Sequence, residues 1–130
     1  MRIMIVSRAL LAFAAVSVLP GIARAHAILI DSQPAPHATV PPGPASIMLH
    51  FNSRIDRGRS VVTLVTPGSA PQRLDVGGDG PADVMTAQTI VQPGEHTLRW
   101  QVLAVDGHIT RGDVPFTASS PALPRVSASK

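Results

Sequence analysis

Residues 95–105, EHTLRWQVLAV, form the longest strand-like stretch of the chain. Leu98, Trp100 and Val102 recur with a period of two, which places their side chains on one face of an extended strand. The stretch runs into Asp106-Gly107, a dipeptide that favours a tight turn. We therefore predict a long β-strand with one face in the core and a turn directly after it.

Shorter strand-like segments precede and follow this stretch. In SIMLHF, residues 46–51, the side chains of Ile47, Leu49 and Phe51 are predicted to face the core, and those of Met48 and His50 to face outward. Five prolines between residues 32 and 44 exclude a helix or a central strand, so that segment is predicted to be an ordered loop. The other predicted strands are residues 27–31, 60–66, 72–76, 83–91 and 113–118.

Together these segments amount to about seven short strands, with turn signals roughly every 8–12 residues. That spacing is typical of an antiparallel β-sandwich or a small barrel. The composition agrees, because 13 prolines and 10 glycines with few aromatic residues favour strands and turns over helices. We predict one all-β domain at residues 26–118, followed by a polar tail at residues 119–130.

The first 25 residues have the pattern of a secretory signal peptide. Arg2 and Arg8 accompany an apolar run at residues 9–19, and Ala23-Arg24-Ala25 has the small-residue pattern of a signal-peptidase site. The apolar run is shorter than the roughly 20 residues that a membrane-spanning helix needs, and an N-terminal membrane anchor is the alternative. We therefore expect export to the periplasm and cleavage after Ala25.

Charge and cysteine content narrow the class of protein. The net charge of +3 is matched by Arg2, Arg8 and Arg24 in the predicted signal, so the mature chain is close to neutral. A basic face for nucleic acid therefore has no support. Cysteine is absent, so packing rather than a disulfide framework must stabilise the domain.

Cleavage after Ala25 would make His26 the mature N-terminus. Its α-amine and its imidazole Nδ1 could then chelate one metal ion from a single residue. Asp106 and His108 are two residues apart, so their side chains point to the same side of an extended segment. Gly107 between them tolerates unusual backbone angles and leaves space for a ligand. We predict that the fold brings this pair to the mature N-terminus.

The predicted donors are an amine nitrogen, two imidazole nitrogens and a carboxylate oxygen. This set suits one copper(II) ion in a tetragonal arrangement, or nickel(II), and zinc in tetrahedral geometry is also possible. Copper(I) prefers sulfur ligands, and only Met48 and Met85 remain after the signal. Because binding needs a deprotonated amine, affinity is expected to fall in mild acid.

Plainer interpretations compete at each of these positions. Asp106-Gly107 could be only a hairpin turn, with His108 incidental. His37 is a weaker candidate as an auxiliary ligand. The remaining polar positions are interpreted as surface or turn residues: His50, Asp83, His96 and the group Arg54, Arg57 and Arg59.

These residues resemble the CopC family of periplasmic copper-resistance proteins over nearly the whole mature length. The matching pieces are His26 directly after the signal, Ser32-x-Pro34-Ala35, Leu49-His50-Phe51, Trp100, Asp106-Gly107-His108, Gly112 and Phe116. The resemblance implies a Greek-key β-sandwich or barrel of the cupredoxin-like kind and a copper(II) site made by His26, Asp106 and His108. Ser53 departs from the family, which often has a carboxylate at that position, and the methionine-rich loop of some members is absent.

The resemblance implies a non-catalytic protein that binds or hands on periplasmic copper for resistance or homeostasis. A CopD-type inner-membrane protein is the partner that it implies. Two alternatives remain. One is a copper-dependent redox enzyme with a histidine-brace site, and the other is a metal-free interaction domain of the immunoglobulin type.

Overall fold

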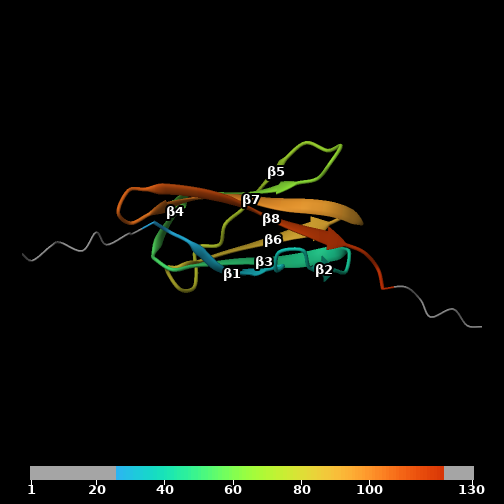
Figure 1. The fold of residues 1–130 in the computed structure, drawn as a ribbon, viewed down its shortest axis with the longest axis horizontal. Helices are drawn as coiled ribbons and strands as arrows, with labels where there is room; N and C mark the ends of the chain where they lie inside the picture. Colours follow the sequence, from blue (N-terminus) through green and yellow to red (C-terminus); the bar gives the residue numbers. More distant parts are fainter. Residues whose placement is uncertain (1–25, 122–130) are drawn as a thin grey trace, which may run out of the picture.

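The computed structural model describes residues 26–121, which fold into two packed β-sheets (Figure 1). The predicted signal at residues 1–25 and most of the predicted tail, residues 122–130, lie outside the described part. No helix within residues 26–121 is long and apolar enough to cross a membrane. The strands are β1 Leu29–Gln33, β2 Thr39–Val40, β3 Gly43–Phe51, β4 Ile55–Val65, β5 Gln72–Leu74, β6 Val84–Val91, β7 Gly94–Ala104 and β8 Ile109–Ala118.

One sheet has the strand order β1-β3-β6, and the other has the order β2-β8-β7-β4-β5. The chain crosses between the sheets repeatedly, since β3 and β6 belong to the first sheet while β4, β5, β7 and β8 belong to the second. All pairings are antiparallel except that of the short β2 with β8. This architecture confirms the predicted all-β sandwich, with one strand more than the approximate count.

The core lies between the two sheets and follows the predicted alternation. Leu49 and Phe51 of β3 are fully buried, and Leu98 and Val102 of β7 are also fully buried. The indole of Trp100 packs edge-on against the ring of Phe51, with ring centroids 5.2 Å apart. The period-two pattern of residues 95–105 therefore identified a strand in the middle of the larger sheet correctly.

The proline-rich segment at residues 32–44 was predicted to be an ordered loop, but part of it is regular strand. It contains β2 and the first residues of β3, including Pro44. Proline is tolerated there because β1 pairs only with the distal part of β3, so Pro44 is paired on one side, with Ile90 of β6. A proline at a locally unpaired edge does not interrupt a ladder of hydrogen bonds.

Residues 52–59 are only partly a turn, because β4 already begins at Ile55. A bulge between Asp56 and Val61 holds the charged residues away from the regular ladder with β7. Arg57 is not simply solvated, which corrects the sequence interpretation. Its guanidinium donates to the carbonyl oxygens of Gly78 at 3.1 Å, Gly80 at 2.8 Å and Pro81, and its Nε donates to that of Val84 at 3.0 Å. It thereby fixes the glycine-rich turn before β6.

His96 is buried, with 3% of its surface exposed, so the interpretation of it as a solvated residue is wrong. Its Nε2 donates to the Gln92 carbonyl oxygen at 2.6 Å, which leaves Nδ1 to accept from the Thr66 hydroxyl at 2.8 Å. Its ring also stacks on Phe116. The period of two already placed residue 96 on the inward face of β7, and the polar type of the residue obscured that signal.

Replacing His96 by Gln is expected to destabilise the domain by about 1–2 kcal/mol, because one buried partner would lose its hydrogen bond. The thermal unfolding midpoint of the variant measures this loss. His50→Gln is the matched control at a half-exposed position and is expected to stay within about 0.5 kcal/mol of the parent. Equal midpoints for the two variants would contradict the structural role of His96.

Candidate metal centre

The turn between β7 and β8 presents Asp106 and His108. The Gly107 N–H donates to the Ala104 carbonyl oxygen at 2.9 Å, and the Ala104 N–H donates to the His108 carbonyl oxygen at 2.8 Å. Gly107 has a φ of 87°, in the left-handed region that favours glycine. The predicted turn is therefore present, and it brings the two side chains together on a tight loop rather than along an extended segment.

Asp106 and His108 form a double contact. The His108 backbone N–H donates to Asp106 Oδ1 at 3.0 Å, and the ring atom Nδ1 lies 2.7 Å from Oδ2. These hydrogen bonds, chiefly the one from the backbone N–H of His108, hold the pKa of Asp106 below its ordinary value. Since an ionised carboxylate can only accept, Nδ1 carries the proton and Nε2 of His108 keeps a free lone pair.

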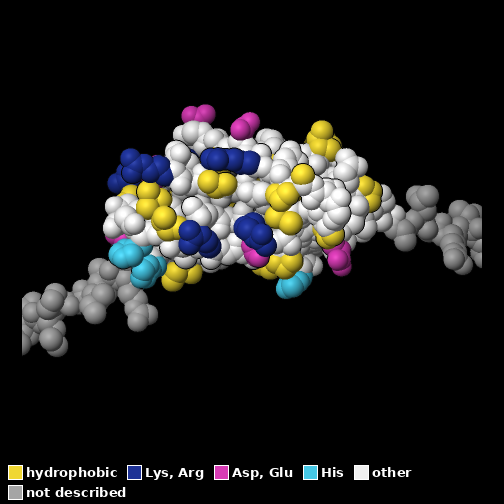
Figure 2. Space-filling view, turned by 90° about the horizontal axis from the view of Figure 1, so that it is seen from above, with side chains coloured by type: hydrophobic (Ala, Val, Ile, Leu, Met, Phe, Trp, Pro, Cys, Tyr) yellow, Lys and Arg dark blue, Asp and Glu magenta, His cyan; other side chains and the backbone are white. Residues whose placement is uncertain are grey.

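His26 lies against this pair. The His26 and His108 rings meet edge to face, with centroids 4.7 Å apart. Figure 1 shows the start of the described chain and the β7–β8 turn at the same end of the sandwich, and Figure 2 shows histidine side chains gathered there. The fold therefore brings together residues that are about 80 positions apart in sequence, as predicted.

The backbone next to His26 is firmly held. Ala27 is fully buried, the Ile28 N–H donates to Asn52 Oδ1 at 2.8 Å, and the Asn52 N–H donates to the Ile28 carbonyl oxygen at 2.9 Å. This two-way tether fixes the chain two residues after His26, before β1 begins. Asn52 was not predicted to have this role, because an asparagine after a strand is usually only a turn residue.

The side chains of residues 26–121 provide no complete metal cage, because no three histidine, cysteine or acidic side chains in this part are grouped to hold an ion. His108 nevertheless contacts both the His26 ring and the Asp106 carboxylate at the surface, where 61% of its own side chain is exposed. A chain that begins at His26 would add the α-amine as a fourth donor. The donor types present fit copper(II), provided that this amine is free.

The other candidate positions lie elsewhere. His50 Nε2 is 3.2 Å from Asp83 Oδ2, and both side chains are partly exposed on the smaller sheet. His37 donates its backbone N–H to Pro115 at 2.7 Å. Because Pro115 follows His108 by seven residues of nearly continuous strand, about 23 Å at the usual rise, His37 does not join the site. The Ser53 hydroxyl is buried without a hydrogen-bond partner in the described part of the chain.

Comparisons with known proteins identify the family of this chain. A family model described as the CopC domain matches residues 29–119. Protein YobA of Escherichia coli K12 is 31% identical over 98 residues, which cover 72% of this chain and 78% of the relative. Copper resistance protein C of Pseudomonas syringae pv. tomato is 29% identical over 113 residues, which cover 80% of this chain and 89% of the relative.

Two solved structures share the fold. The crystal structure of CopC from Methylosinus trichosporium OB3b superposes with a TM-score of 0.63 at 22% identity and covers 72% of this chain and 93% of its own. That of PcoC, a methionine-rich copper resistance protein from Escherichia coli, superposes with a TM-score of 0.58 at 23% identity and covers 72% and 99%. With the family match across β1 to β8, these findings establish that the chain belongs to the CopC domain family.

Proposed function

We propose that the protein binds one copper(II) ion at the end of the sandwich where His26 meets the Asp106–His108 pair. The observation that carries this proposal is the contact of the His26 and His108 rings, 4.7 Å between centroids, beside an ionised carboxylate. The donor set of nitrogen and oxygen without sulfur favours copper(II) over copper(I). The relation to a copper resistance protein supports copper as the metal.

Each residue has a defined part in this site. His26 contributes its α-amine and Nδ1, which close a chelate on one residue. His108 contributes Nε2, the ring nitrogen that Asp106 leaves free. Asp106 is the oxygen donor of the proposed set. In the structure its carboxylate lies against Nδ1 of His108, on the far side of the ring from Nε2, so it exchanges this contact for the ion when both residues bind it.

The proposed biological role is to bind and hand on copper in the periplasm, in resistance or homeostasis, after the signal is removed behind Ala25. A CopD-type inner-membrane protein is the proposed partner for transfer. A binding role fits better than catalysis, because Asp106 would take a coordination position that a redox enzyme leaves open for its co-substrate. Trp100, the one tryptophan, is only 6% exposed and offers no aromatic platform for a substrate.

Replacing His108 by Ala tests the site. We expect copper(II) affinity to fall by at least roughly a hundredfold, because removal of a ligand costs more than removal of an outer-shell partner, which costs about 10–100-fold. Titration against a competing chelator measures the change. His50→Ala removes a histidine that also contacts a carboxylate and is expected to change affinity by less than about twofold. Equal losses in the two variants would exclude the proposed centre.

A further inference from the structure

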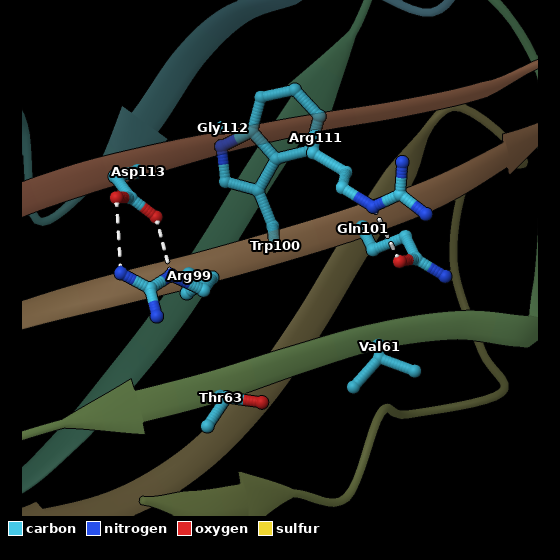
Figure 3. Close-up of a pocket in the computed structure, with 8 residues that line it drawn as sticks. All are labelled: Val61, Thr63, Arg99, Trp100, Gln101, Arg111, Gly112 and Asp113. Atoms are coloured by element: carbon cyan, nitrogen blue, oxygen red, sulfur yellow. Dashed lines mark hydrogen bonds and ion pairs between the residues drawn. The ribbon is translucent and has the colours of Figure 1, made fainter.

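The outer face of the five-stranded sheet carries a groove with a neutral floor and basic walls. Its floor is Val61 and Thr63 of β4, two short side chains that point away from the core. Longer side chains on the neighbouring strands rise on both sides of them. The resulting hollow has a volume of about 510 Å³ and is lined by residues of β4, β7 and β8 (Figure 3). β5 pairs with the other edge of β4 and borders the hollow there.

The strand register places arginines on both walls. Arg73 of β5 lies directly opposite Thr63, and Arg99 of β7 lies opposite Thr63 on the other side. Directly paired residues on one face have neighbouring side chains. The two arginines are therefore about two strand spacings apart, roughly 10 Å, with the floor between them. Arg111 of β8 extends the second wall beside Gln101.

Contacts within the wall orient two of these arginines. Arg99 Nε and Nη2 lie 3.1 and 3.4 Å from the two oxygens of Asp113. Arg111 uses only its Nε, which donates to Gln101 Oε1 at 2.7 Å. Within residues 26–121, neither terminal nitrogen of Arg111 has another partner and Arg73 makes no hydrogen bond or ion pair. Figure 3 shows the Arg111 guanidinium held in this way at the groove.

The charge of this groove is opposite in sign to that of the described domain. Residues 26–121 contain six arginines and eight carboxylates, so the described domain is net negative with histidines neutral. Arg99 and Arg111 line the groove and Arg73 borders its floor, so half of these arginines lie at the groove, where Asp113 is the one lining carboxylate. Figure 2 shows both basic and acidic side chains on this face, so the excess of positive charge is a property of the groove. A ligand that complements the groove is narrow and carries negative charge along both of its sides.

We propose that this groove docks an extended acidic segment of a partner protein, which lies along β4 with carboxylates directed to Arg73, Arg99 and Arg111. The guanidinium fork matches a carboxylate in two-point hydrogen bonding. The metal centre lies at the β7–β8 turn rather than on this sheet face, so a docked segment leaves it accessible. The docking surface does not depend on the proposed copper site.

A protein segment suits the groove better than an anionic membrane does. A bilayer is nearly flat and contacts what protrudes, whereas the neutral contacts here lie at the bottom of a hollow. Membrane-surface elements also present large apolar side chains next to their cations. Of the large or apolar side chains that line the hollow, Val61 is short and half-buried and Trp100 is only 6% exposed, so neither protrudes from the surface. An extended polypeptide segment is narrow enough to reach this floor.

The probe is a synthetic twelve-residue peptide of alternating glutamate and threonine, added to the chain that begins at His26. Amide chemical shifts in nuclear magnetic resonance are expected to change along β4, β5, β7 and β8 around the groove. Arg73→Gln with Arg111→Gln is expected to weaken binding by about tenfold or more, since charge-assisted hydrogen bonds contribute about 1.5–3 kcal/mol each. Copper affinity is expected to stay unchanged in that variant.

Arg54→Gln with Arg59→Gln is the matched control, because it removes the same charge from exposed positions outside the groove. It is expected to weaken peptide binding by no more than about twofold. Equal weakening by the two double variants, or no binding of the peptide at 50 mM salt, would overturn the proposal. The proposal would also be overturned if the chain bound phosphatidylglycerol vesicles but not the peptide, and if the groove variant lost that vesicle binding.

Discussion

Acetylation of the α-amine of a chain that begins at His26 is expected to weaken copper(II) binding by roughly 10²–10⁴-fold, the range by which linking two binding groups strengthens binding. The amine and Nδ1 of His26 act as linked donors, so loss of the amine removes a ligand and the chelate at once. The rest of the site stays in place, because the tether through Ile28 and Asn52 does not involve the amine.

The sequence allows the α-amine to be acetylated selectively. Lys130 is the only lysine of the chain, so in a Lys130→Arg variant the α-amine is the only amino group that acetic anhydride can modify. Competition titration before and after acetylation then reports the amine alone. The His108→Ala form of the same chain is the control. Its copper(II) affinity is already lower than that of the parent, and acetylation is expected to lower it further. Unchanged affinity after complete acetylation would show that the amine is not a ligand.

Gly112→Ala is expected to destabilise the fold by about 3 kcal/mol, at the upper end of the usual cost of overpacking a core. A Cβ at residue 112 would lie 2.7 Å from Cε2 of the Trp100 indole and closer still to its Cζ2. The indole cannot move freely, because it also packs against the Phe51 ring in the core. For a domain of about 100 residues this loss lowers the thermal midpoint by more than about 10 °C.

Gly78→Ala is the matched control, because a Cβ there meets nothing within 4 Å and its φ is not positive. It is expected to leave the midpoint nearly unchanged. A double variant, Trp100→Phe with Gly112→Ala, is expected to be less destabilised than the sum of its single variants, since the smaller ring leaves room for the methyl group. A Gly112→Ala protein as stable as the Gly78→Ala protein would show that Trp100 does not cover Gly112.

Several parts of the fold were accessible from the sequence because they depend on side-chain alternation. The inward faces of residues 46–51 and 95–105 were predicted correctly, since a period of two reports which side of a strand is buried. The short β2 strand was not predicted, because two residues are too few for a period. It is stabilised by parallel pairing with β8, a contact between distant segments that no local pattern encodes.

The residues of the candidate site were likewise only partly predictable from the sequence. Asp106 and His108 could be selected because their spacing and the intervening glycine imply a shared location. The approach of His26 depends on which strands pair, and the resemblance to a known family anticipated it. The roles of Asn52 and Arg57 were missed, since each binds backbone groups of a segment more than 20 residues away. A charged or amide side chain in a turn gives no signal of such a partner.

The most direct test of the metal centre is electron–nuclear double resonance of one equivalent of copper(II) bound to the exported protein, whose first residue is identified by mass spectrometry. The account predicts a chain that starts at His26 and couplings from three nitrogens, one of which disappears on acetylation. A chain that starts elsewhere, or copper without coupling to an amine nitrogen, would contradict it.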